Sequence, residues 1–352
     1  MFVLDSHCDT PSQILRLRDM SLDNDHAHVD FPKLRRGGVD GAFFALYVPA
    51  SLKGDAAASY ADRLMECVHS CLSDDAVLTV SREQALANKE AGRFSVFVGL
   101  ENGSAIGNSL EVLRKYYDAG VRYVTLCHSA DNQICDSCAS RVGTWKGLSP
   151  FGRNVVKEMN RLGMLVDVSH VSDRTFYDVL DCSAMPVVAT HSCCRALADH
   201  PRNMTDDMIV RLAEAGGVIQ INFYPLFLDD TFSVVLEKSG IMQRGETVER
   251  EFIKDPSDPA RRKAWNAVQD ELLALPRPSF RRIADHIDHV VELVGIDHVG
   301  IGSDYDGIEV TPMGMEDISM MPVLFEELRG RGYSESDIEK IAGANFLRLL
   351  GD

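Results

Sequence analysis

The chain has 352 residues, of which 45% are hydrophobic and 25% charged, a composition typical of a soluble globular protein and not of a disordered or collagen-like chain. Its 53 acidic residues outnumber 36 lysines and arginines and give a net charge of -17, so its surface repels nucleic-acid phosphates and anionic lipids. With no apolar run of 18 residues and no secretory leader at Met1–Asp5, we expect a cytoplasmic protein with nine free cysteines and neither nucleic-acid nor membrane partners.

Eight short β-branched or apolar runs, each followed by a polar turn and an amphipathic stretch, predict strands that alternate with helices. They are Phe2–Leu4, Gly41–Tyr47, Ser95–Leu100, Arg122–Leu126, Leu165–Val168, Val187–Ala189, Val218–Asn222 and Val299–Gly302. Such alternation implies a parallel sheet, and eight units predict an α/β fold in which the sheet closes into a (β/α)8 TIM barrel.

Several helix starts are marked by residues whose side chains can accept hydrogen bonds from free backbone N–H groups. We expect Ser109 to cap a helix with an apolar face that includes Tyr117, and Thr205 to cap the helix that follows it. Ser334, with Asp337 three residues later, resembles a capping box near the end of the chain.

A bare barrel needs roughly 250 residues, so we expect a single domain, residues 1–352, with much of the excess in one helical insertion. This insertion, about 224–279, follows the seventh predicted strand and includes the charged stretch Arg244–Arg250 and the helical-looking Pro259–Leu275. At the catalytic end of a barrel it is either a lid or substrate wall, or equally a passive surface excursion.

Active sites of such barrels form at the carboxyl ends of the strands, so polar residues that follow each predicted strand are informative. After the first strand, His7 and Asp9 point to the same side of an extended segment and suit a divalent ion such as zinc. A capping Asp and a hydrogen-bonded His explain this pair equally well. Glu101 follows the third strand and could bridge two cations, although a lone acid there is more often a turn or cap residue.

Three more histidines, His128, His170 and His191, follow the fourth, fifth and sixth predicted strands. Each alone is more often structural, but four of the eleven histidines at strand ends are hard to explain by structure alone. Asp304 follows the eighth strand, where a general base could reach a metal-bound water. Together these residues satisfy the needs of two-metal hydrolysis, in which a carboxylate spaces the ions and a shared water is acidified toward a pKa of about 7.

The order and spacing of these segments resemble the renal (membrane) dipeptidase family, the zinc dipeptidases among the amidohydrolase barrels. The resemblance runs over nearly the whole chain, and the combination is more specific than any single motif. The matching segments are Asp5-Ser6-His7-Cys8-Asp9-Thr10-Pro11, Gly99-Leu100-Glu101-Asn102-Gly103, Leu126-Cys127-His128-Ser129, Asp167-Val168-Ser169-His170, Thr190-His191-Ser192, Arg202-Asn203, Gly300-Ile301-Gly302-Ser303-Asp304-Tyr305-Asp306-Gly307 and Asn345-Phe346.

The resemblance implies two zinc ions per chain. His7 and Asp9 would bind one ion, and His170 and His191 the other. Glu101 and a hydroxide would bridge the two, which assigns Glu101 to the catalytic centre as well as to the metal site.

The resemblance also implies a small dipeptide substrate with free termini, including dipeptides with a D-residue in second place. Arg202 would pair with the C-terminal carboxylate, for which a guanidinium fork is well shaped. His128 would polarise the peptide carbonyl or stabilise the oxyanion, and Asp304 would contact the substrate and shuttle the proton. Without the resemblance, Arg202 is better explained as a surface residue after a helix break at Pro201.

Alternatives remain at this point. The same metals would serve another binuclear amidohydrolase that acts on a cyclic amide, a lactone or a phosphoester, or a non-catalytic metal-binding barrel. Members of the family are often homodimers, so a homodimer is an open alternative for this chain. Cys8 is expected to point away from the metals by strand alternation, and Cys135-x-x-Cys138 lacks the second pair of a zinc site.

Overall fold

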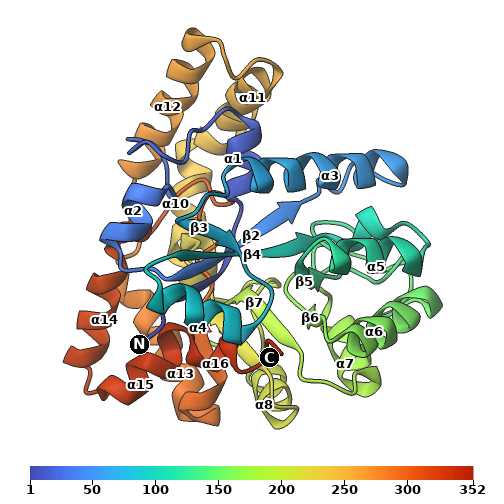
Figure 1. Cartoon of the computed structure of the whole chain (residues 1–352). Helices are drawn as coiled ribbons and strands as arrows, with labels where there is room; N and C mark the ends of the chain where they lie inside the picture. Colours follow the sequence, from blue (N-terminus) through green and yellow to red (C-terminus); the bar gives the residue numbers. More distant parts are fainter. Residues whose placement is uncertain (352) are drawn as a thin grey trace.

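In the computed structural model, which describes residues 1–351, nine parallel strands form one sheet at the centre of the molecule (Figure 1). The strands are β1 (Leu4–Cys8), β2 (Gly41–Tyr47), β3 (Ala76–Leu78), β4 (Phe94–Glu101), β5 (Val121–Thr125), β6 (Leu165–Asp167), β7 (Val188–Ser192), β8 (Val218–Ile221) and β9 (Val299–Ile301). Eight of them follow one another in the order β1-β2-β4-β5-β6-β7-β8-β9, while β3 pairs with β4 off this path. The sequence reasoning missed β3, which has only three residues.

The two end strands of this order, β1 and β9, meet through the backbone that follows β9. The Asp304 N–H donates to the His7 carbonyl at 3.0 Å, and the Asp9 N–H donates to the Tyr305 carbonyl at 2.9 Å. Cys8 and Tyr305 thereby form a parallel bridge. The sheet is a nearly closed barrel of eight parallel strands, which confirms the predicted (β/α)8 TIM barrel.

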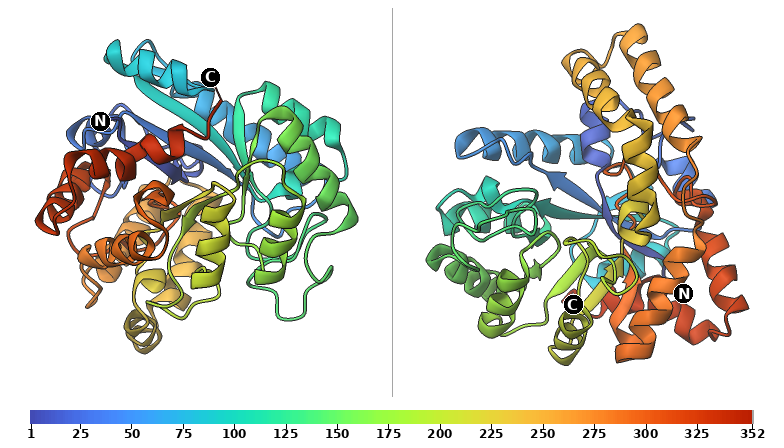
Figure 2. Two further views of the ribbon diagram at one scale, coloured as in Figure 1. Left: turned by 90° about the horizontal axis from the view of Figure 1, so that it is seen from below. Right: turned by 180° about the vertical axis from the view of Figure 1, so that it is seen from behind.

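Helices surround the barrel, as the two views of Figure 2 show. They are α1 (Thr10–Leu15), α2 (Phe31–Arg36), α3 (Asp55–Ser70), α4 (Arg82–Glu90), α5 (Leu110–Asp118), α6 (Pro150–Leu162), α7 (Asp173–Cys182), α8 (Asp206–Glu214), α13 (Arg281–Val294), α14 (Met321–Gly330), α15 (Glu335–Glu339) and α16 (Asn345–Leu347). Within residues 1–351, none of the helices combines the length and the apolar character that crossing a bilayer requires.

Two of the three expected helix caps are formed. Thr205 caps α8, and Ser334 begins α15 with a complete capping box. Ser109 does precede α5, but its side chain accepts no capping hydrogen bond. On the expected apolar face of α5, Leu113 is buried but Tyr117 is only half-buried, while the neighbouring Tyr116 is buried.

The insertion after the seventh barrel strand is helical, as predicted. Between β8 and α13 lie α9 (Pro225–Leu228), α10 (Thr231–Ser239), α11 (Ile241–Lys254) and α12 (Pro259–Leu273), and the last two project at the top of Figure 1. α10, α11 and α12, together with Val310 from the segment after β9, share a hydrophobic cluster of buried residues: Phe232, Leu236, Ile241, Val268, Leu272 and Val310. An ion pair of 2.9 Å between Arg16 and Glu249 joins α11 to the end of α1.

Aromatic side chains fill the barrel interior toward the amino ends of its strands. Phe43 stacks on Phe97 with ring centroids 4.8 Å apart and meets Phe346 of α16 edge-on at 5.3 Å. Gly99 leaves room for the buried ring of Tyr123, since a Cβ at position 99 would lie 2.1 Å from Tyr123 Cζ. With this end packed, the polar side chains of the interior gather at the carboxyl ends of the strands.

Most predicted strand boundaries are correct to within one residue, and two strands differ by more than that. β1 begins at Leu4 instead of ending there, and β7 continues past the predicted end at Ala189 to Ser192. His7 and His191 therefore lie within strands and not after them. Polar side chains can continue a strand when they face the barrel mouth, and a search for apolar runs does not detect that continuation.

Candidate active site

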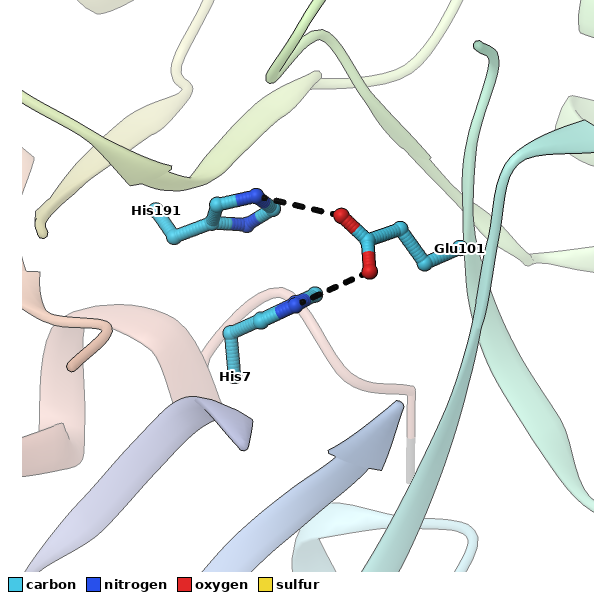
Figure 3. A group of neighbouring side chains, drawn as sticks. All are labelled: His7, Glu101 and His191. Atoms are coloured by element: carbon cyan, nitrogen blue, oxygen red, sulfur yellow. Dashed lines mark ion pairs between the residues drawn. The ribbon is translucent and has the colours of Figure 1, made fainter. Parts of the chain in front are cut away.

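Five of the residues that the sequence singled out meet at the carboxyl end of the barrel. His7 lies on β1, Glu101 is the last residue of β4, and His191 lies on β7. Figure 3 shows these three side chains pointing toward one another from different strands. His128 and His170 come from the loops after β5 and β6, three residues beyond the end of each strand. The barrel therefore assembles side chains that are far apart in the sequence.

The Glu101 carboxylate lies at the centre of this cluster. Its Oε2 is 3.4 Å from His7 Nε2. Its Oε1 is 3.2 Å from His170 Nε2, 3.4 Å from His191 Nε2 and 3.8 Å from His128 Nε2. Glu101 is only 2% exposed. Its two oxygens therefore face different imidazoles in a site shielded from bulk water.

Two aspartates extend the cluster on the side of His7. Asp9 Oδ2 is 3.5 Å from His7 Nε2. Ligand atoms of His7, Asp9 and Asp304 all lie within 4.8 Å of one another. Asn222, the residue after β8, donates from Nδ2 to Asp304 Oδ2 at 2.8 Å. The sequence reasoning overlooked Asn222, although a polar residue at a strand end was the signal used for the histidines.

The donor atoms of the cluster suit a metal-coordination site. His7 Nε2 and Asp9 Oδ1 are buried without a hydrogen-bond partner among the described residues. The Nε2 atoms of His170 and His191 face each other at 2.9 Å. Imidazole nitrogens and carboxylate oxygens are ligands that zinc accepts, so the residues present fit a zinc site.

Three overlapping groups each place three ligand atoms within 4.8 Å of one another. They are His7, Glu101 and His191; Glu101, His128 and His170; and His7, Asp9 and Asp304. Glu101 and His7 each belong to two groups, so the cluster is continuous. All the expected metal ligands lie in it, and His128 and Asp304 lie there as well.

Burial and the neighbouring charges set the protonation of the histidines in the metal-free protein. Burial, with the positive charges of Arg202 and the neighbouring histidines added, holds the pKa values of His170 and His191 well below the usual range. Burial likewise lowers the pKa of His128 to about 3. Burial also lowers the pKa of His7, but Glu101 and other carboxylates outweigh it and raise that pKa well above its usual value. Three of the four rings are therefore neutral, the form that binds metal.

The carboxyl groups are shifted in the opposite direction. Burial, reinforced by Asp9 and Glu101, raises the pKa of Asp304 to about 7. Burial, followed by the charge of Glu101, raises the pKa of Asp9 to about 6. The burial and the neighbouring carboxylates that raise these two pKa values also favour divalent ions there.

The backbone is strained beside these side chains. His170 has φ 69° and Asp304 has φ 65°, both in the left-handed region that residues with a Cβ seldom occupy. Asn102, next to Glu101, has φ 76°. Each such residue costs on the order of 1–3 kcal/mol and persists where the surroundings hold it. The fold therefore keeps three strained positions at the cluster.

Arg202, in the loop between β7 and α8, lies against the cluster and is only 6% exposed. Its Nη2 donates to the His191 carbonyl at 2.8 Å, and its Nη1 donates to Ser192 Oγ at 3.0 Å. Its Nε is buried and has no partner within the described part of the chain. A buried guanidinium with no carboxylate beside it is suited to bind an anionic ligand.

The cysteines stay outside this cluster. All nine are free thiols. Cys8, between the expected ligands His7 and Asp9, has its Sγ 3.9 Å from Ser303 Oγ and belongs to none of the possible metal-binding groups of the described residues. Cys135 and Cys138 belong to none of the possible metal-binding groups that the described residues form.

Comparison with known proteins agrees with this geometry. The whole chain, residues 1–352, matches the model of the membrane dipeptidases, peptidase family M19. It is 33% identical over 372 residues to an uncharacterized dipeptidase of Schizosaccharomyces pombe, and the match covers 99% of this chain and 80% of the relative. Dipeptidase verJ of Clonostachys rogersoniana is 34% identical over 337 residues, or 92% of this chain and 75% of the relative.

The solved structures show the same relationship. The crystal structure of the metallopeptidase dipeptidase AC has a TM-score of 0.81 and 25% identity, and the match covers 99% of this chain and 98% of that chain. The barrel, the histidine–carboxylate cluster and the match over the full length lead to one conclusion. The chain belongs to the membrane dipeptidase family, peptidase family M19, and is a metallo-dipeptidase.

Proposed function

We propose that this metallo-dipeptidase hydrolyses the peptide bond of unblocked dipeptides, including L-Xaa-D-Xaa dipeptides, at a centre of two zinc ions. The observation that carries the proposal is the position of Glu101. Its Oε2 faces His7, while its Oε1 faces His170 and His191. A carboxylate whose two oxygens address separate sets of nitrogen ligands is placed to bridge two cations.

The proposed ligands divide around this bridge. His7 and Asp9 would hold one zinc ion, His170 and His191 would hold the other, and Glu101 would contact both. Zinc ions bound there would supply a nucleophilic water at neutral pH and polarise the scissile carbonyl.

Asp304 is the proposed proton shuttle. Its raised pKa of about 7 allows it to accept and return a proton near neutral pH. The amide of Asn222 holds its Oδ2, which leaves Oδ1 free to take the proton from the attacking water and to return it to the departing amine. His128, neutral because burial lowers its pKa to about 3, can donate a hydrogen bond to the carbonyl oxygen of the substrate.

Arg202 is proposed to bind the free C-terminal carboxylate of the substrate. It is tied to the carbonyl of His191, itself a proposed zinc ligand. The anchor for the carboxylate would therefore lie next to the proposed zinc ligands, as a substrate with a single residue between the scissile bond and the free terminus requires. This geometry favours dipeptides over longer peptides.

The test is a hydrolysis assay on zinc-loaded protein. The substrates are L,L and L,D dipeptides, each compared with its C-terminal amide and with a tripeptide that extends it. We expect cleavage of the free dipeptides and at least about tenfold lower kcat/KM for the amides. Equal rates for free and amidated substrates, or no cleavage by protein that holds two zinc ions, would contradict the proposal. Cleavage of a lactone, cyclic amide or phosphoester instead would indicate another amidohydrolase.

A further inference from the structure

Asp167, the last residue of β6, is a fully buried carboxyl group outside the metal cluster. Its Oδ2 accepts hydrogen bonds from the hydroxyls of Thr125 at 2.5 Å and Thr190 at 2.7 Å. Its Oδ1 accepts from the backbone N–H groups of Ser169 and Thr190, both at 2.9 Å. Four donors on two oxygens match a carboxylate that only accepts, and they offset the cost of burying it.

The bond from Thr190 to Asp167 decides which nitrogen of His191 carries a hydrogen. A hydroxyl has one hydrogen, and Thr190 gives it to Asp167. Thr190 Oγ1 can therefore only accept from His191 Nδ1, which lies 2.8 Å away. With its hydrogen on Nδ1, the neutral ring turns the lone pair of Nε2 toward Glu101, whose Oε1 is 3.4 Å away.

Asp167 also holds the backbone beside the second histidine of this half of the cluster. It binds the N–H of Ser169, whose Oγ accepts from the His191 N–H at 3.1 Å. The next residue is His170, in its left-handed conformation with φ 69°. One carboxylate thus supports the chain at both His170 and His191.

The other half of the cluster lacks this arrangement. His7 Nδ1 lies 2.8 Å from the Tyr123 hydroxyl. Across residues 1–351, no carboxylate forms a hydrogen bond with that hydroxyl in turn, so no charged group acts on His7 Nδ1 through it. A buried carboxylate, Asp5, also accepts from the His7 backbone N–H at 3.2 Å, but it does not act on the imidazole, so the two halves differ in how the tautomer of the histidine is set.

We propose that Asp167 and Thr190 are positioning residues that hold His191 in its metal-binding tautomer and so strengthen one of the two zinc sites. The inference rests on the proposed binuclear function. Groups behind a metal ligand that fix its tautomer typically contribute about 10- to 100-fold to metal affinity. Because the support acts on His170 and His191 alone, its loss weakens one zinc site and spares the other.

The experiment is a stepwise zinc titration of the metal-free, full-length protein against a chromophoric chelator at fixed pH. Thr190→Val removes the hydroxyl and keeps the shape, while Thr190→Ser restores it. Thr125→Val is the matched control, since it removes the other hydroxyl on Asp167 Oδ2 from an equally buried threonine. Asp167→Asn disturbs the same hydrogen bond from its other end, because it removes the carboxylate that accepts from Thr190. Cobalt spectra of each variant report the geometry of the weakened site.

In the wild-type protein we expect two tight sites. Thr190→Val and Asp167→Asn should weaken one site about 10- to 100-fold and leave the other unchanged, whereas Thr190→Ser and Thr125→Val should keep both. Unchanged affinities in Thr190→Val, or an equal loss in Thr125→Val, would overturn the positioning role. If Thr190→Val does not fold, the titration of Asp167→Asn decides between the same two outcomes. A wild-type protein that binds fewer than two zinc ions would instead refute the binuclear function, and the inference with it.

Discussion

Replacing Arg202 separates recognition of the substrate carboxylate from the chemistry at the metals. Arg202 is 6% exposed, and two nitrogens of its guanidinium donate hydrogen bonds to β7, one to the His191 carbonyl and one to Ser192 Oγ. Its Nε has no partner in the described chain. Arg202→Met keeps the apolar stem and removes the guanidinium, whose Cζ lies 5.6 Å from the centre of the Phe227 ring, together with its charge and donors.

The size of the effect follows from the bonds that are lost. Hydrogen bonds to charged groups contribute about 1.5–3 kcal/mol each. At about 1.36 kcal/mol per factor of ten, the loss of one such bond lowers kcat/KM for a free dipeptide by about 10- to 150-fold. The corresponding C-terminal amide lacks the negative charge and should change far less. Arg202→Lys should recover part of the loss, because it keeps the charge without the fork.

The assay measures kcat/KM for each dipeptide and its amide, together with zinc content and thermal unfolding. Arg195→Met is the matched control, because Arg195 lies in the same loop but pairs with Asp173 at 2.7 Å. We expect that variant to keep wild-type preference for the free carboxylate. An equal loss for dipeptide and amide in Arg202→Met, at unchanged zinc content, would refute carboxylate binding and assign Arg202 to support of β7.

Three further outcomes are expected. Asp304→Asn should lower kcat about 10²- to 10⁴-fold with both zinc ions retained; a loss of metal instead would make Asp304 a ligand. Burial lowers the pKa of His286 to about 4, so this neutral histidine contributes stability above about pH 6.5 that is lost as the pH falls toward 4. Measured by denaturant unfolding, the free energy of unfolding of His286→Gln should fall by about 3 kcal/mol less than that of the wild-type protein between pH 6.5 and pH 4. An equal fall in both proteins would contradict this prediction. Gly99→Ala places a Cβ against Tyr123 and should lower the free energy of unfolding by about 1–3 kcal/mol, whereas Gly330→Ala, with open space around it, should not.

The sequence predicted the barrel well because its strands are short apolar runs separated by amphipathic helices. The prediction failed where a strand is too short, or too polar, to appear as an apolar run. β3 contributes three residues to the edge of β4 and is too short for a periodic pattern. β1 continues through His7 and β7 through His191. Because these strand residues are polar, a search for apolar runs assigns them to loops.

The cluster could be predicted because each strand of a parallel barrel delivers its last residues to the same end. The residues behind the cluster could not. Asp167 and Thr190 belong to different strands, and their contact depends on the register and twist that the closed barrel imposes. Asn222 beside Asp304 was missed for a similar reason, since only the fold brings β8 and the segment after β9 together.

The most direct test of the binuclear centre is a crystal structure of the zinc-loaded protein with anomalous diffraction measured at the zinc edge. Two zinc peaks are expected at the barrel mouth, one beside His7 and Asp9 and one beside His170 and His191, with the Glu101 carboxylate between them. A single peak, or two peaks that do not share Glu101, would contradict the proposed centre.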